Sequence, residues 1–242
     1  VNAYKVFTTV AFVAFMGQSI MFTLGALTGW TWTWYPASFS ALCALLLAVM
    51  CIEADGTPFS AGANDNATAA GLVLALAQHL RDQPLNYTRL WLVCTGCEEV
   101  QHYGAIDFFR RHRDEMINPH ALVFEMLGCA GPGYLTREGI IVPFNAHPKM
   151  LDLAHQVARQ NPNLAAYPVK INGGNTEMAD ALRAGVPAIS LFGLTRAGEA
   201  PYWHMVEDTP DKMDPDVMRR TYAFTLKLIR ELDDTRPGPQ GE

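Results

Sequence analysis

Charged side chains are missing from an early part of the chain. No Asp, Glu, Lys or Arg occurs between Val6 and Ile52, a run of 47 residues in a protein of 242. One bilayer crossing requires roughly 20 apolar residues, so this run is long enough for two crossings and a turn. The absence of charge therefore favours a two-helix transmembrane hairpin over residues 1–52. The alternative is a buried core helix followed by a buried strand.

The segment Trp30–Ser38 is the expected turn of this hairpin. Its three tryptophans and its tyrosine are typical of the interface between lipid and water, and Pro36 suits the first turn of a second helix. A cleaved signal peptide would have a shorter apolar core, followed by small residues. Lys5 is the sole basic residue before the hairpin, so its orientation stays open. We therefore expect an integral membrane protein that contacts lipid through residues 6–52.

Basic residues and cysteines are scarce as well. All 24 acidic residues follow Ile52, with 17 of the 18 basic ones, and this acidic balance argues against a nucleic-acid partner. Five cysteines do not make a disulfide framework in a chain of this size. Cys94 and Cys97 have the spacing of a redox motif, but they run into two glutamates. Packing or lining of a site is therefore favoured over thiol exchange.

The rest of the chain alternates between helical and strand-like segments. Helices are expected at residues 67–81, 103–115, 149–160, 178–184 and 214–234. Short apolar runs typical of buried strands occupy residues 89–95, 121–126 and 187–192. Such alternation predicts an α/β fold with a mostly parallel sheet and helices on both faces. We assign residues 53–234 to this domain and residues 235–242 to a flexible tail.

Acidic residues lie where such a fold places its sites, at the carboxyl ends of strands. Asp65 directly precedes a helix, Glu98 and Glu99 follow one predicted strand, and Glu125 ends another; His204 lies in a loop after the last strand. Carboxylates gathered in this way repel one another unless protons or a cation intervene. Carboxylates with an imidazole suit zinc or a similar divalent ion. Taken singly, each residue has a bland interpretation as a helix cap, a solvated loop or a hydrogen-bonded histidine.

The adjacent pair Glu98 and Glu99 indicates a division of labour. Neighbouring side chains in an extended segment diverge, so the two cannot easily bind one ion together. One is therefore expected to be a metal ligand, which leaves the other to accept a proton from water activated by the metal.

Together and in this order, these residues resemble a zinc-dependent aminopeptidase family. That family also includes glutaminyl cyclases and the ectodomains of glutamate carboxypeptidase and the transferrin receptor. The matching stretches are Gly62–Gly71, Thr95–Glu99, Val123–Gly128, Gly173–Glu177, Gly185–Ile189, Tyr202–His204 and Asp208–Thr209. The resemblance implies a three-layer α/β/α sandwich, one or two zinc ions and peptide substrates.

The resemblance also assigns roles to these residues. Asp65 would bridge two ions, Glu99 and His204 would be further ligands, and Glu98 would be the general base. Glu125 stands where the family has a metal-binding aspartate, and its carboxylate keeps the oxygen donor with one methylene more.

One metal-binding histidine that the family expects, in a His-x-Asp stretch before the bridging aspartate, is missing. No histidine precedes His79. We favour the interpretation that this histidine lies before Val1 and that the hairpin is an insertion. In the other interpretation, Ala48–Asp55 is the expected strand, with Glu53 in place of the histidine.

Three functions remain open at this point. The first is an aminopeptidase that removes amino-terminal residues. The second is a cyclase of amino-terminal glutamine with a single zinc ion, and the third is a catalytically degenerate binding module. Glu177 is either an acid in the first turn of a short helix or a group that binds the free amine of a substrate.

Overall fold

The computed structural model describes residues 2–139 and 142–235 of the chain. It divides into two compact units, Val1–Phe59 and Ser60–Glu242. The boundary thus lies a few residues beyond the predicted one, because the second helix runs on to Asp55. Most of the predicted tail, residues 236–242, lies outside the described residues.

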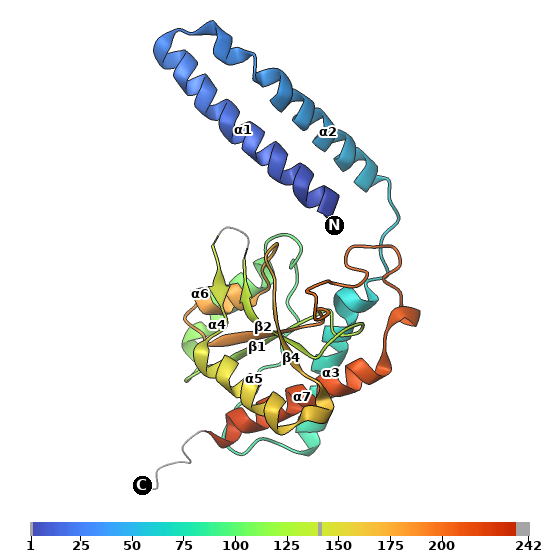
Figure 1. Cartoon of the computed structure of the whole chain (residues 1–242). Helices are drawn as coiled ribbons and strands as arrows, with labels where there is room; N and C mark the ends of the chain where they lie inside the picture. Colours follow the sequence, from blue (N-terminus) through green and yellow to red (C-terminus); the bar gives the residue numbers. More distant parts are fainter. Residues whose placement is uncertain (1, 140–141, 236–242) are drawn as a thin grey trace. The chain divides into compact units, whose positions relative to one another are not determined.

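The first unit is a pair of helices, α1 (Asn2–Thr28) and α2 (Ala37–Asp55), joined through a 3-10 turn at Thr31–Trp34 (Figure 1). Ser40 donates a hydrogen bond to the carbonyl of Ala14 at 3.2 Å and so links the two helices. Two segments are long and apolar enough to cross a membrane, Thr9–Thr28 and Thr31–Asp55, and only 11% of each is buried. This exposure disagrees with the alternative of a buried helix and strand, although a signal sequence meets the same criteria of length and composition.

The interpretation of Ala48–Asp55 as a strand is wrong, because these residues form the last turns of α2. Ala48, Met50, Glu53 and Ala54 favour helical backbone, and the segment continues the run of Leu45–Leu47 without a break.

The second unit is a mixed sheet between two layers of helices. Its strands are β1 (Ala121–Glu125), β2 (Gly133–Glu138), β3 (Phe144–Asn145), β4 (Tyr167–Lys170) and β5 (Ala188–Phe192). The helices are α3 (Thr68–Asp82), α4 (Tyr103–His112), α5 (Pro148–Gln160), α6 (Met178–Arg183) and α7 (Pro215–Asp234). Helices α3 and α5 both pack on α7, whereas α4 packs on α6. The predicted α/β/α sandwich is confirmed (Figure 1).

The sheet has the order β1-β5-β2-β3, with β4 paired to β2. Strands β1 and β5 are parallel, with Ala121 opposite Ala188 and Glu125 opposite Phe192. Strand β2 runs parallel to β4 and antiparallel to β5 and β3. The buried strand β5 and the side chains of Leu76, Tyr134 and Phe224 belong to the core.

The predicted strand at residues 89–95 is wrong. This segment has no ladder partner, and β1 pairs with β5 alone among the described strands. Its side chains nevertheless alternate, since Trp91, Val93 and Thr95 are partly covered while Leu92 and Cys94 are exposed. The apolar pattern therefore predicted the alternation of this segment but not its pairing, which depends on a neighbour distant in sequence.

The helices agree more closely with expectation. The long last helix begins as expected, because the Asp214 carboxylate accepts hydrogen bonds from the N–H groups of Asp216 and Val217 and Pro215 occupies the first turn. The helix expected at residues 103–115 divides into α4 and a 3-10 turn, Arg113–Glu115.

Candidate metal centre

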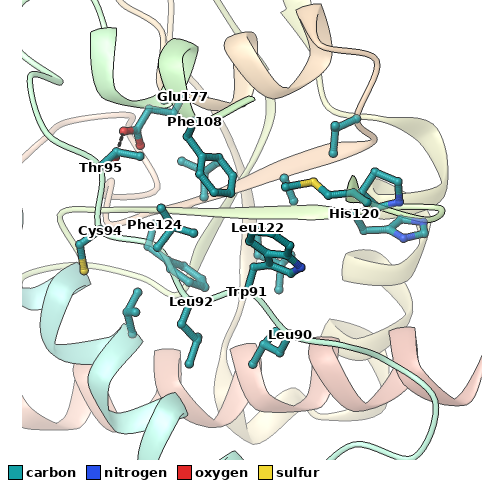
Figure 2. Close-up of a pocket in the computed structure, with 18 of the residues that line it drawn as sticks. Leu90, Trp91, Leu92, Cys94, Thr95, Phe108, His120, Leu122, Phe124 and Glu177 are labelled. Atoms are coloured by element: carbon teal, nitrogen blue, oxygen red, sulfur yellow. Dashed lines mark hydrogen bonds between the residues drawn. The ribbon is translucent and has the colours of Figure 1, made fainter. Parts of the chain in front are cut away.

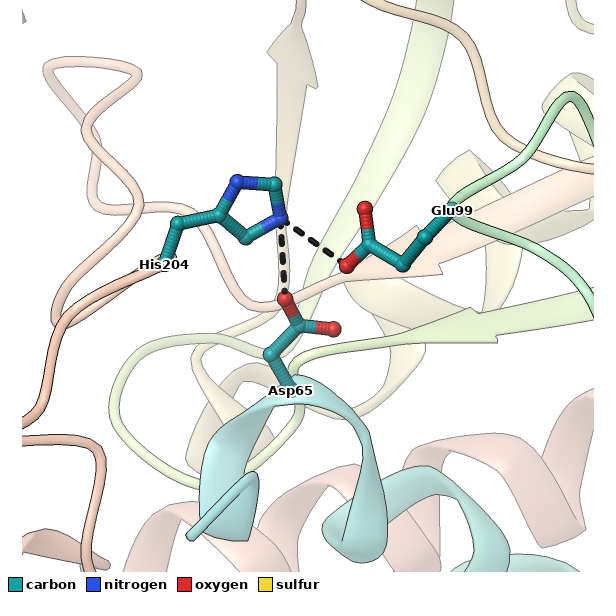
Figure 3. Close-up of side chains that lie close together, drawn as sticks. All are labelled: Asp65, Glu99 and His204. Carbon is teal, nitrogen blue, oxygen red and sulfur yellow. Dashed lines mark hydrogen bonds and ion pairs between the residues drawn. The ribbon is translucent and has the colours of Figure 1, made fainter. Parts of the chain in front are cut away.

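Three of the predicted ligands meet at one point. Ligand atoms of Asp65, Glu99 and His204 all lie within 4.8 Å of one another. The Nε2 atom of His204 lies 2.9 Å from Oε1 of Glu99 and 3.5 Å from Oδ2 of Asp65. Figure 3 shows the three side chains converging from a turn before α3 and from two loops. Two carboxylates and an imidazole at this spacing fit a divalent ion such as zinc.

Asp65 is directed into the centre by the residues on either side of it. Asn64 accepts a hydrogen bond from the N–H of Gly128 at 2.8 Å, and Asn66 accepts one from the N–H of Met126 at 3.1 Å. Both asparagines thus bind the chain that leaves β1. Asp65 itself has non-helical backbone and does not cap α3, so the bland interpretation of this residue as a helix cap is wrong.

Asp208 joins the turn of Asp65 to the loop of His204. Its two carboxylate oxygens accept the N–H groups of Asn64, at 2.7 Å, and Asp65, at 3.0 Å. The backbone N–H of Ala63 donates to the carbonyl of Asp208 as well. Asp208 is 1% exposed, so these bonds form away from competing water.

Burial and mutual repulsion raise the pKa values of two acidic groups of the site, Asp65 and Glu125. Burial raises the pKa of Asp65 to about 6, and the charge of Glu99 adds to this effect. Burial also raises the pKa of Glu125 to about 9, with the charges of Glu98 and Asp65 contributing. Such shifts are typical of functional sites, and a bound cation would offset the repulsion.

Glu125 does not belong to the group of three. Its side chain is buried, and its Oε2 atom has no hydrogen-bond partner. An unpaired buried carboxylate oxygen is costly and suits a position beside a cation. The role of Glu125 as a ligand stays a prediction.

Glu98 lies beside the predicted ligands, and its carboxylate contacts the imidazole of His102. The Nε2 atom of His102 is 3.2 Å from Oε1 of Glu98, and its Nδ1 atom is 2.6 Å from Oδ2 of Asp180. Hydrogen bonds to Asp180 and Glu98 raise the pKa of His102 to about 10, so the ring is an imidazolium at neutral pH.

An apolar cavity of about 670 Å³ adjoins Glu98, between residues 88–95 and β1. Leu92 of the extended segment and Leu122 and Phe124 of β1 line it (Figure 2). At one end Thr95 donates a short hydrogen bond to Oε1 of Glu177, and burial raises the pKa of Glu177. Glu177 and Glu98 both line this cavity, and Glu177 is also the residue directly before α6; its role as a group that binds substrate stays a prediction.

Sequence reasoning missed the residues that hold the site together. Asn64 and Asn66 belong to the motif around Asp65, and their alternation with it was a usable signal, since side chains two apart share a direction in extended backbone. His102 follows Glu98 by four residues, but its second partner, Asp180, lies 78 residues further on. Cys94 and Cys97 are both exposed, and Cys94 contributes to the lining of the apolar cavity.

Several solved structures share this fold. A glutaminyl cyclase from an Acidobacteriales bacterium is 20% identical with a TM-score of 0.57, over 72% of this chain and 63% of that one. The LapA aminopeptidase of Legionella pneumophila is 16% identical with a TM-score of 0.59, over 74% and 47%. A zinc aminopeptidase from Bacillus subtilis, BSAP, is 15% identical with a TM-score of 0.57, over 73% and 43%. The chain thus covers less than two thirds of the length of these proteins.

No curated protein sequence matches the chain. The model of Peptidase family M28 matches residues 49–229, which include the three converging side chains, Glu98 and Glu125. This match also begins inside α2, upstream of the motifs that carry the resemblance. The extent of the match, three quarters of the sequence, together with the shared fold, shows that the chain belongs to Peptidase family M28.

Proposed function

We propose that the chain is a zinc aminopeptidase that removes residues from the amino termini of peptides and is anchored in a membrane by residues 6–52. The observation that carries this proposal is the convergence of Asp65, Glu99 and His204 beside Glu98. A bound zinc ion supplies Lewis-acid polarisation of the scissile carbonyl and lowers the pKa of water.

The residues of the chain divide the remaining work. Asp65, Glu99 and His204 would hold the ion, and Glu125 offers an additional oxygen from its buried position. Glu98 accepts a proton from the attacking water and delivers it to the leaving amine as the peptide bond breaks. Glu98 therefore returns to its ionised form at the end of the reaction. Glu177, beside Glu98 on the wall of the cavity, would bind the free amino group of the substrate.

Hydrolysis of aminoacyl substrates by the whole chain in detergent tests this proposal. We expect chelators to abolish activity and zinc to restore it. Glu98→Gln should retain zinc and lose about 10²- to 10⁴-fold in kcat, which is the usual contribution of a general base. Asp82→Asn, at an exposed position of α3 that does not line the cavity, serves as the control. Activity that survives both the chelator and Glu98→Gln would show that the metal and the base are wrongly assigned.

A single-zinc glutaminyl cyclase is the second candidate function. The observation in its favour is that, among the described residues, one group of three ligands comes together and no second group does. Three protein ligands suffice for one zinc ion. Mass analysis of the product separates the two reactions, because cyclisation releases ammonia and hydrolysis releases a free amino acid. A well-folded chain that binds no zinc would instead support a binding module.

A further inference from the structure

The side chain of His102 connects the predicted general base to a buried acid on another helix. Its two ring nitrogens lie 2.6 Å from Oδ2 of Asp180 and 3.2 Å from Oε1 of Glu98. The other oxygen of Asp180 lies 2.8 Å from Nη1 of Arg183. The side chains of His102 and Asp180 are 11% and 3% exposed, against 33% for Glu98. The exposed fraction therefore increases along this series of contacts, from the buried Asp180 through His102 to the predicted base Glu98.

The backbone strengthens this connection. The N–H of His102 donates to the carbonyl of Glu98 at 2.9 Å, so the two residues are joined by main chain and side chain. His102 has φ of 58° directly before α4, a conformation that a histidine adopts uncommonly. The turn thereby places the imidazole within 3.2 Å of the carboxylate.

Resting on the proposed function, we propose that His102, held by Asp180, is a positioning residue that orients the carboxylate of Glu98 for proton transfer. Proton transfer requires the base within hydrogen-bond distance of the proton it removes. A carboxylate on a loop has several rotamers of similar energy, and a charged hydrogen bond to one of its oxygens selects among them. That bond occupies one of the two oxygens and directs the group without removing it from the site.

The bland alternative is that His102 only joins the start of α4 to α6. The two roles predict opposite results for a matched pair of variants. In His102→Gln the side-chain amide reaches about as far as Nε2 and can donate to Glu98, whereas in His102→Asn it reaches only as far as Nδ1 and can donate to Asp180. Asparagine is the better residue at positive φ, so a purely structural role favours His102→Asn.

Steady-state kinetics of the whole chain in detergent, with zinc content measured for each variant, provide the test. We expect His102→Gln to keep kcat within about five-fold of the wild type and His102→Asn to lose about 10²-fold, the scale of a misplaced catalytic group. KM and zinc content should change less than about two-fold, since neither variant alters a metal ligand or Glu177. Equal kcat for the two variants, or a loss confined to KM or zinc content, would overturn the role of His102.

A further variant, Asp180→Asn, tests the same role if the variants of His102 fail to fold. Asp180→Asn leaves His102 in place but replaces its charged partner, and we expect kcat to fall several-fold with KM unchanged; an unchanged kcat would overturn the inference. A wild-type chain without chelator-sensitive hydrolysis would overturn the proposed function and this role together. An active wild type with equal Asn and Gln variants would overturn this role alone.

Discussion

The carboxylate of Asp208 accepts the backbone N–H of Asp65 at 3.0 Å, across 143 positions of sequence. The same carboxylate accepts the N–H of Asn64 at 2.7 Å. One buried side chain thus holds the turn that carries the predicted ligand Asp65. Asp208 also lies four residues beyond another predicted ligand, His204.

Asp208→Asn should therefore weaken both the fold and the metal centre. The amide has one acceptor oxygen, so one buried N–H of the Asp65 turn loses its partner, at a cost of about 1–3 kcal/mol in the free energy of unfolding. Loss of such outer contacts typically lowers metal affinity about 10- to 100-fold. Denaturant unfolding and zinc titration measure the two effects. Asp211→Asn, on the exposed surface nearby, is the control, and equal zinc affinity in both variants would contradict this prediction.

His204→Ala should abolish zinc binding at concentrations that saturate the wild type. Removal of one of three converging ligands is more severe than removal of an outer contact, so we expect affinity to fall by at least about 10²-fold. His112→Ala removes a histidine that pairs with Glu115 and not with the ligands, and it should bind zinc normally. Isothermal titration calorimetry with both variants measures the difference.

Glu138 makes stability depend on pH away from the metal centre. It is fully buried, and burial raises its pKa to about 7 from 4.5. The folded chain therefore binds this proton more tightly than the unfolded chain, and stability falls as the pH rises from about 4.5 through 7. The loss amounts to something on the order of 3 kcal/mol. Glu138→Gln should remove it, so the gain in melting temperature over the wild type should be small at pH 4.5 and large at pH 8. A gain that is the same at both pH values would contradict the assignment.

The hairpin should keep the whole chain in the membrane fraction. Its exposed apolar side chains, such as Phe12, Val13 and Leu45, would each be stabilised by transfer from water to lipid. We expect a high-pH carbonate wash, which strips peripheral proteins, to leave the chain in the pellet. Recovery in the supernatant would contradict the assignment of residues 6–52 as a membrane anchor.

Local patterns predicted much of this fold. The helices α3, α5, α6 and α7 and the strands β1 and β5 lie close to their expected bounds, because each is a continuous apolar or periodic segment. Strands β2 and β4 were not expected. Strand β2 ends in polar Thr-Arg-Glu, and β4 has four residues and includes Pro168, so neither shows the apolar run of a buried strand.

The site divides in the same way. Asp65 and His204 could be predicted as site residues because their motifs, taken together and in order, resemble those of a known family, although each residue alone has a bland interpretation. The residues that position these side chains could not be predicted from the sequence. The pairing of His102 with Asp180, for example, depends on how α4 packs against α6. Pairing across a fold is a property of tertiary structure, and one sequence alone does not specify it.

The convergence of the three ligands has a mechanical consequence. Glu99 and His204 are 105 residues apart, and an ion held by both would act as a cross-link between two loops and the turn of Asp65. Closing so long a loop restricts the unfolded chain far more than it restricts the folded one. Bound zinc would thus stabilise the folded chain in addition to its part in catalysis. A protease added after chelation should therefore first cut the loops at residues 96–101 and 196–207.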